Sequence, residues 1–165
     1  MSDSRLQEIV TKAVVGRAER RIIWRHTVPA EGVTGVLGVH VTNSAVAVTE
    51  ADGSEVQVLA EIDLWCAGAS STKVIRCTAR HLERVALQTL GPVLGEPEFS
   101  ARLGGSVQAT GVSVTEGQIT LNLAATVHVE MSAVTRLWVR SYNIDDASLD
   151  DVEDPDDESD SGLVE

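Results

Sequence analysis

The residues with the clearest potential for chemistry are a histidine and a glutamate on one predicted strand. His128 and Glu130 lie two positions apart within Gln118–Ser132, and residues i and i+2 of a strand project from the same face. An imidazole beside a carboxylate supplies two of the ligands that a zinc ion requires. A metal-dependent hydrolase at this pair therefore stays open as an alternative. A solvated pair on a strand surface is the simpler interpretation, and we expect no bound metal.

Other catalytic signatures are missing from the sequence. It contains no Gly-x-Ser-x-Gly, no P-loop and no Gly-x-Gly-x-x-Gly after a strand. The remaining histidines, His26, His40 and His81, lie in no HExxH or Cys-X-X-Cys context. The acidic residues of the body are scattered rather than paired. We therefore predict a protein that is not an enzyme, with no catalytic residues and no cofactor.

Two cysteines, Cys66 and Cys77, are too few for a disulfide scaffold. Both fall on or beside apolar strand positions, which favours two buried, reduced thiols. The alternative is that one of them becomes exposed under oxidising conditions and crosslinks subunits.

Negative charge is concentrated at the C-terminus. The 165 residues carry a net charge of −12, and the segment 145–165 holds eleven acidic residues without a lysine or arginine. The rest of the chain is nearly neutral, which argues against binding of nucleic acid because a phosphate footprint needs a surplus of basic residues. No apolar run approaches the roughly 18 residues of a membrane span, so we expect a soluble protein with no membrane insertion. Residues 145–165 are too polar to pack, and we predict a disordered acidic tail.

A short amphipathic helix is predicted near the N-terminus, over Arg5–Val15. Ser4 to Gln7 fit a capping box, and Gly16 can end the helix. So short a helix is marginal alone in water, so it must pack on its own body or on a neighbouring subunit. The apolar residues at helical spacing are therefore predicted self-assembly contacts: Leu6, Ile9, Val10 and Val14.

From residue 20 onward the hydrophobic period is two, which is typical of strands. Turns are predicted at Ala51–Ser54 and at Glu116-Gly117. The stretches 20–90 and 98–144 look alike, which indicates a degenerate repeat of two β-meanders. We predict a mainly β fold, an antiparallel β-sandwich, with the helix at 1–16, the sandwich body at 17–144 and the tail at 145–165. The predicted strands are Arg20–Val28, Gly35–Asn43, Ala45–Glu50, Glu55–Cys66, Lys73–Ala79, Phe99–Ala109, Val112–Thr115, Gln118–Ser132 and Val134–Ser141.

Several segments resemble one family of bacterial proteins, the outer spore coat morphogenetic protein CotE family. Residues Gln7–Val15 are similar to the N-terminal motif of that family. His26–Glu31 and Val36–Asn43 resemble its Thr-x-Pro stretch and its Leu-Gly-containing strand. Val56–Trp65, with Ile62-Asp63-Leu64-Trp65, is similar to its Asp-Ile-Asn-Val-Trp strand, and the acidic tail matches in character.

The resemblance implies a non-enzymatic scaffold of the spore coat. Such proteins are made in the mother-cell cytoplasm, assemble with themselves on the forespore surface and recruit outer coat proteins. The expected partners are then further copies of this chain and other spore coat proteins. In this role the acidic tail would bind basic coat proteins through Asp150, Asp151, Glu153, Asp154, Asp156, Asp157 and Glu158.

A different class of function also fits the composition. A β-sandwich can hold a small ligand or a carbohydrate without catalysis, with the tail serving only solubility. A pocket lined by tryptophan and polar side chains would favour this binding module over the scaffold.

Overall fold

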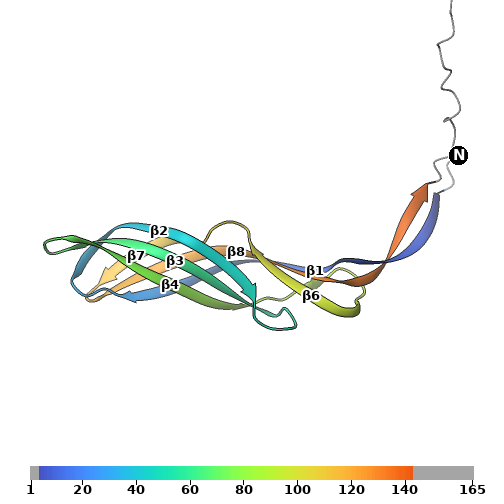
Figure 1. Ribbon diagram of the computed structural model, residues 1–165, viewed down its shortest axis with the longest axis horizontal. Coiled ribbons are helices and arrows are strands. Elements are labelled where there is room, and N and C mark those ends of the chain that lie inside the picture. The colour runs from blue at the N-terminus through green and yellow to red at the C-terminus, as the bar shows by residue number, and fades with distance from the viewer. Residues whose placement is uncertain (1–3, 143–165) are drawn as a thin grey trace, which may run out of the picture. The chain divides into compact units, whose positions relative to one another are not determined.

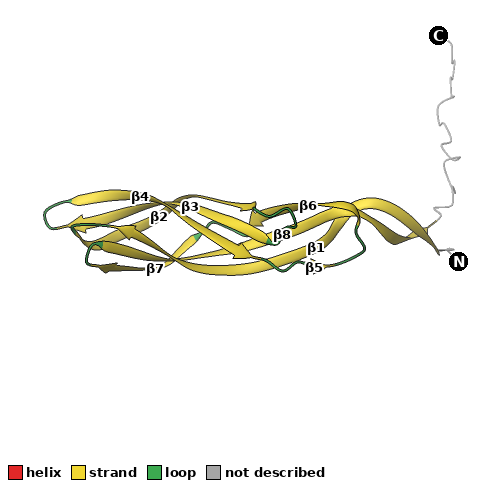
Figure 2. Cartoon of the chain, turned by 90° about the horizontal axis from the view of Figure 1, so that it is seen from below, coloured by secondary structure: helices red, strands yellow, loops and turns green. Residues whose placement is uncertain are grey.

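The computed structural model describes residues 4–142, and every regular element in that range is a β-strand (Figures 1 and 2). The strands are β1 (Ser4–Pro29), β2 (Val33–Val48), β3 (Glu55–Gly68), β4 (Thr72–Arg84), β5 (Gln88–Thr89), β6 (Leu94–Leu103), β7 (Gln108–Thr115) and β8 (Gln118–Tyr142).

The described chain divides into two units. The larger one, residues 10–137, contains nearly all of the strands, and the smaller one joins residues 4–9 of β1 to residues 138–142 of β8. The larger unit contains the two packed sheets and their core.

The strands form two antiparallel sheets. In the first sheet β3 lies between β2 and β4 and pairs with both along nearly its whole length. In the second sheet the order is β5-β1-β8-β6, and β7 also pairs with β8. Strand β8 pairs with β7 through its first residues and with β6 from Val127 to Val134. This confirms the predicted fold class of two antiparallel sheets.

Strands β1 and β8 run antiparallel, as a series of contacts between them shows. The backbone N–H of Ala30 donates to the carbonyl of Gly117, and the hydroxyls of Thr27 and Thr120 lie 3.5 Å apart. Farther along, Arg17 forms an ion pair with Glu130. Each step toward the N-terminus of β1 is therefore matched by a step toward the C-terminus of β8. This is the register of an antiparallel ladder.

The core lies between β3 and β8, and strict alternation builds it. Alternate residues of both strands are 0–1% exposed: Val56, Val58, Ala60, Ile62, Leu64 and Cys66 in β3, and Ile119, Leu121, Leu123, Val127 and Val129 in β8. Burial of so many aliphatic side chains, each contributing about 1.5–3 kcal/mol, is the main stabilising term of the fold.

Both predicted turns are confirmed. Gly53 and Gly117 have φ of +71° and +76°, in the left-handed region that glycine adopts without strain. A Cβ on Gly53 would also collide with the Phe99 ring, so the β2–β3 turn needs glycine for packing against β6 as well.

The predicted helix over Arg5–Val15 is wrong, because this segment is part of strand β1. Ile9, Val10, Thr11, Val14 and Val15 are β-branched, which lowers helix propensity and favours strands. The apolar spacing fits a helix, but a 26-residue strand that pairs with β8 satisfies the backbone over a much longer stretch. Tertiary pairing therefore overrides the local pattern.

The end of the body also differs from the prediction. Val134–Ser141 does not return as a separate strand, because β8 continues without a break to Tyr142. Ala133 and Thr135, each 1% exposed, extend the buried alternate positions of β8 past the predicted break. Likewise β2 is one strand where two, Gly35–Asn43 and Ala45–Glu50, were predicted. The predicted strand Arg20–Val28 is part of β1 and belongs to the sheet that contains β8, not to the sheet of β2, β3 and β4. The tail 145–165 lies outside the described residues.

Candidate functional site

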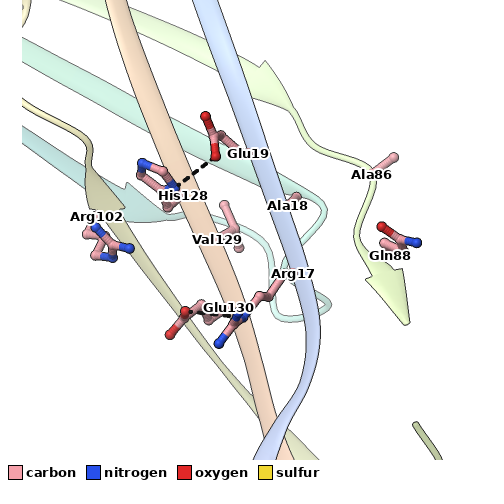
Figure 3. Close-up of a pocket in the computed structure, with 9 residues that line it drawn as sticks. All are labelled: Arg17, Ala18, Glu19, Ala86, Gln88, Arg102, His128, Val129 and Glu130. Carbon is pink, nitrogen blue, oxygen red and sulfur yellow. Dashed lines mark ion pairs between the residues drawn. The ribbon is translucent and has the colours of Figure 1, made fainter. Parts of the chain in front are cut away.

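The predicted His128–Glu130 pair lies on the outer face of β8, where Glu19 and Arg17 reach across from β1 toward the two side chains (Figure 3). Nδ1 of His128 is 3.6 Å from Oε2 of Glu19, and Oε1 of Glu130 is 3.6 Å from Nε of Arg17. Glu130 therefore has an ionic partner on the neighbouring strand, and the His128 ring lies beside a carboxylate there. Within residues 4–142, no group of three or more His, Cys, Asp or Glu side chains is arranged to hold a metal ion.

An open groove of about 590 Å³ runs over this face. Its polar lining comes from Arg17, Glu19, Gln88, Arg102, His128 and Glu130, as Figure 3 shows. The lining is charged and of mixed sign, without an aromatic side chain. Trp65 and Trp138, candidates for a carbohydrate-binding pocket, are 49% and 66% exposed and do not line this groove. The groove suits charged partners rather than sugars.

Arginines at every fourth residue mark the outer face of β1. Alternate residues Ile22, Trp24 and Val28 are buried, so the intervening positions point outward. Arg17, Arg21 and Arg25 occupy these outward positions, and Arg102 of β6 lines the same groove as Arg17. We call these four residues the arginine face. The sequence contains the signal, arginines at spacing four, but only Arg21 and Arg25 fall within the predicted strand Arg20–Val28, and Arg17 lies before it.

A polar cluster joins the two sheets between β1 and β4. The Trp24 and His81 rings stack with centroids 5.3 Å apart, and His81 Nε2 lies 3.0 Å from Glu83. Nε of Arg20 donates to the other oxygen of Glu83 at 2.6 Å. Burial disfavours the ionised form of Glu83, but the hydrogen bonds with His81 and Arg20 outweigh burial and lower the pKa of Glu83. The ionised carboxylate of Glu83, on β4, is therefore the form that binds Arg20 of β1.

The two cysteines lie apart on neighbouring strands. Cys66 is opposite Lys73, whereas Cys77 is opposite Ile62, four residues away along β3. This offset of about 13 Å exceeds the reach of a disulfide, so the two thiols cannot join within one chain. Cys66 is fully buried and Cys77 half-buried, and burial raises the pKa of both thiols. Of the two, only Cys77 has any access to solvent.

Open strand edges form a second candidate site. Outside the contact with β8, β1 pairs only with β5, at Gly16 and Arg17. On the other side, the pairing of β6 with β8 ends at Val134. Among residues 4–142, no third strand therefore pairs with the outer side of β1 before Val15 or with β8 after Val134. We call these two stretches the open edges.

The open edges also carry exposed apolar side chains. In the larger unit Val10 is 63% and Leu137 40% exposed, and in the smaller unit Leu6 is 65% and Trp138 66% exposed. Two predicted self-assembly residues, Leu6 and Val10, are thus accessible, whereas Ile9 and Val14 are half-buried. The four do not share one face as predicted, because consecutive residues of a strand, such as Ile9 and Val10, point to opposite sides.

A comparison with known protein families gives one match over nearly the whole chain. Residues 5–164 match the family described as outer spore coat protein E (CotE). The chain belongs to the CotE family. No curated protein and no solved structure matches it.

Membership in the CotE family confirms the resemblance and makes this chain a spore coat protein. CotE is a structural family of the coat and not a known family of enzymes, and its members act alongside other coat proteins. In the part of this chain that the structure describes, no helix is long and apolar enough to cross a membrane.

The Glu83 cluster gives this CotE-family fold a defined acid response. A carboxyl group whose pKa is lowered by folding stabilises the protein above its ordinary pKa of 4.5, and that stabilisation is lost as pH falls through the folded pKa. We expect Glu83→Gln to lower the free energy of unfolding by roughly 1–2 kcal/mol at pH 7 and to weaken its dependence on pH below 4.5. Urea unfolding between pH 7 and pH 3 measures both effects. Glu116→Gln, in the exposed β7–β8 turn, is the control, and an equal acid response in the wild type and Glu83→Gln would contradict the assignment.

Proposed function

We propose that this protein is a self-assembling structural subunit of the spore coat that also binds other coat proteins. The observation that carries the proposal is the pair of open edges, on β1 before Val15 and on β8 after Val134. Family membership supports the setting, with synthesis in the mother cell and assembly on the forespore surface.

An open edge is a template for pairing with another chain. Each unpaired residue presents a backbone N–H or C=O that a further strand can satisfy. Exposed apolar side chains add to this, since burial of a large one contributes about 1.5–3 kcal/mol before the costs of association. Val10 and Leu137 in one unit, and Leu6 and Trp138 in the other, supply such side chains next to the unpaired backbone.

The two open edges belong to different strands, which determines the kind of assembly they can build. When the β1 edge of one copy pairs with the β8 edge of the next, the contact is heterologous and leaves one edge free at each end. Such a contact extends into a fibre or a layer unless its rotation closes a ring. Repetition across a layer also turns a modest contact into strong avidity. These are the properties that a coat scaffold needs.

Two further roles are part of the proposal. The acidic residues of the tail, from Asp150 to Glu158, attract basic coat proteins at low ionic strength. Cys77, the half-buried thiol on edge strand β4, is the better placed of the two cysteines for a crosslink between copies, since Cys66 is fully enclosed.

Substitution of Val10 by lysine tests assembly through the open edges. A charge on an edge strand disfavours pairing with another chain, so Val10→Lys should reduce large assemblies at least tenfold by analytical ultracentrifugation and negative-stain electron microscopy. Leu82→Lys is the matched control, because Leu82 is similarly exposed (54%) but lies on β4. Circular dichroism should show an intact β body in both variants. Assemblies of wild-type size from Val10→Lys, or equal loss from Leu82→Lys, would rule out the open edges as the contact.

Neutralisation of the tail tests the binding of partners. We expect a variant with Asn or Gln at Asp150, Asp151, Glu153, Asp154, Asp156, Asp157 and Glu158 to assemble normally but to retain several-fold less of the basic coat proteins. The measurement is the amount of purified basic coat proteins held on immobilised full-length protein in 50 mM salt. The wild type in 0.5 M salt should behave like the variant, because screening weakens exposed charge pairs. Unchanged retention would remove the tail from this role.

A further inference from the structure

Strand β4 has a long and regular free side within the larger unit. It is the outermost strand of the sheet β2-β3-β4 (Figure 1), and all 13 of its residues pair with β3 without a bulge. Among residues 4–142, no strand pairs with its other side. Alternate residues of an antiparallel strand direct their N–H and C=O groups to opposite sides, so about half of the backbone groups of β4 face this free side. We call the free side of Thr72–Arg84 the β4 edge.

The outer face of β4 is basic and apolar. Exposed residues alternate with buried or half-buried ones along the strand, and the exposed set contains no carboxylate. Arginine recurs in it at every fourth residue, at Arg76, Arg80 and Arg84. Val74 and Leu82 lie in the same row and are 49% and 54% exposed. A strand added at the β4 edge would therefore place its own outer row beside three guanidinium groups and two apolar side chains.

Strand β3, the native neighbour of β4, shows which chemistry this row selects. Asp63 lies directly opposite Arg76, and its Oδ1 is 3.4 Å from Nε of the arginine. Glu55 lies directly opposite Arg84. Opposite charges that face each other across two strands stabilise a sheet, so carboxylates are the expected neighbours of these arginines.

The pairing with β3 leaves part of this positive charge without a partner. Arg80 lies opposite Leu59, and no ion pair of Arg80 is present among residues 4–142. The side chain of Arg76 is 84% exposed although it contacts Asp63. A guanidinium group has five N–H donors, so these arginines can bind further carboxylates from the free side of the strand.

We propose that the β4 edge binds an extended acidic segment of another protein by strand addition. Backbone hydrogen bonds to β4 would hold the segment, and its side chains would determine the specificity. Carboxylates at every fourth residue would lie opposite the three arginines, and apolar side chains between them would cover Val74 and Leu82. The β4 edge is separate from the open edges and from the acidic tail. The inference therefore goes beyond the proposed function and does not rest on it.

A second copy of this chain fits the β4 edge poorly, because its own β4 carries arginines. When two antiparallel β4 strands pair with their outer faces together, every register that overlaps by more than half of the strand places arginines of the two copies directly or diagonally opposite each other. Like charges directly opposite are destabilising, and diagonal neighbours lie within reach of long side chains. A Cys77 crosslink between copies would have to hold the two strands together against this repulsion.

A synthetic peptide of eleven residues tests the proposal on the full-length protein. Threonine fills the peptide except for glutamate at positions 1, 5 and 9 and valine at positions 3 and 11. In an antiparallel register these five positions lie opposite Arg84, Arg80, Arg76, Leu82 and Val74 respectively. A second peptide has glutamine in place of the three glutamates. Fluorescence anisotropy of the labelled peptides measures Kd for both in 20 mM salt.

We expect the glutamate peptide to bind at least tenfold more tightly than the glutamine peptide. This preference should fall at least fivefold in 0.5 M salt, because screening weakens exposed charge pairs. Arg80→Gln should weaken binding of the glutamate peptide at least fivefold. Arg21→Gln is the matched control, since Arg21 is also an exposed arginine of the larger unit but lies on β1 in the other sheet. Its Kd should equal that of the wild type.

Two results of these measurements would overturn the proposal. One is equal binding of the two peptides, or binding of neither. The other is an equal loss from Arg80→Gln and Arg21→Gln, which would show that the peptide does not distinguish the β4 edge from the arginine face.

Hydrogen exchange by mass spectrometry tests whether the contact is strand addition. Saturating glutamate peptide should slow about half of the amides in 73–84 at least tenfold, since a new strand would add backbone hydrogen bonds along the β4 edge, while β3 stays unchanged. Binding without this protection would rule out strand addition. Protection of β4 in the protein alone, increasing with protein concentration, would show that a second copy occupies the edge and would overturn the assignment to an acidic partner.

Discussion

The antiparallel pairing of β1 with β8 is the interaction on which the rest of the structure depends. These strands have 26 and 25 residues, far longer than the five or six that are usual, and they come from opposite ends of the described chain. Strand β8 carries one side of the core, and β1 brings Trp24 and Arg20 to the seam with the other sheet. Loss of this pairing would separate the two sheets at that seam.

Two unequal surfaces result from this pairing. Along its middle, β8 has β1 on one side and β7 or β6 on the other, and the outward side chains of β1 form most of the arginine face. Toward residue 4 of β1 and residue 142 of β8, partners are missing on the far side of each strand and the open edges begin. The arginines of β1 and the open edges thus lie on different stretches of the same two strands.

Much of this could be predicted from the sequence, and the exceptions have a physical cause. Alternation over Gln118–Ser132 and Glu55–Cys66 identified both core strands, because one buried face imposes a period of two wherever a sheet covers a core. The prediction for residues 5–15 failed because their apolar spacing fits a helix. The strand that pairs with them, β8, lies more than a hundred residues away in the sequence. The arginine face was missed for a related reason: its ion pair with Glu130 exists only once β1 and β8 meet. Local sequence patterns predict the burial of side chains well, but they predict the pairing of strands that are distant in sequence poorly.

Hydrogen exchange of the backbone tests most directly whether the open edges are where copies of this protein join. Exchange by mass spectrometry would be compared between dispersed and assembled protein, peptide by peptide. We expect amides in 5–14 and 135–142 to exchange at least tenfold more slowly after assembly, since a new strand would add backbone hydrogen bonds along the open edges, while the core peptides of β3 stay unchanged. Unaltered exchange at both edges, together with new protection on β4 or β2, would show that copies join through the other sheet and would contradict the account.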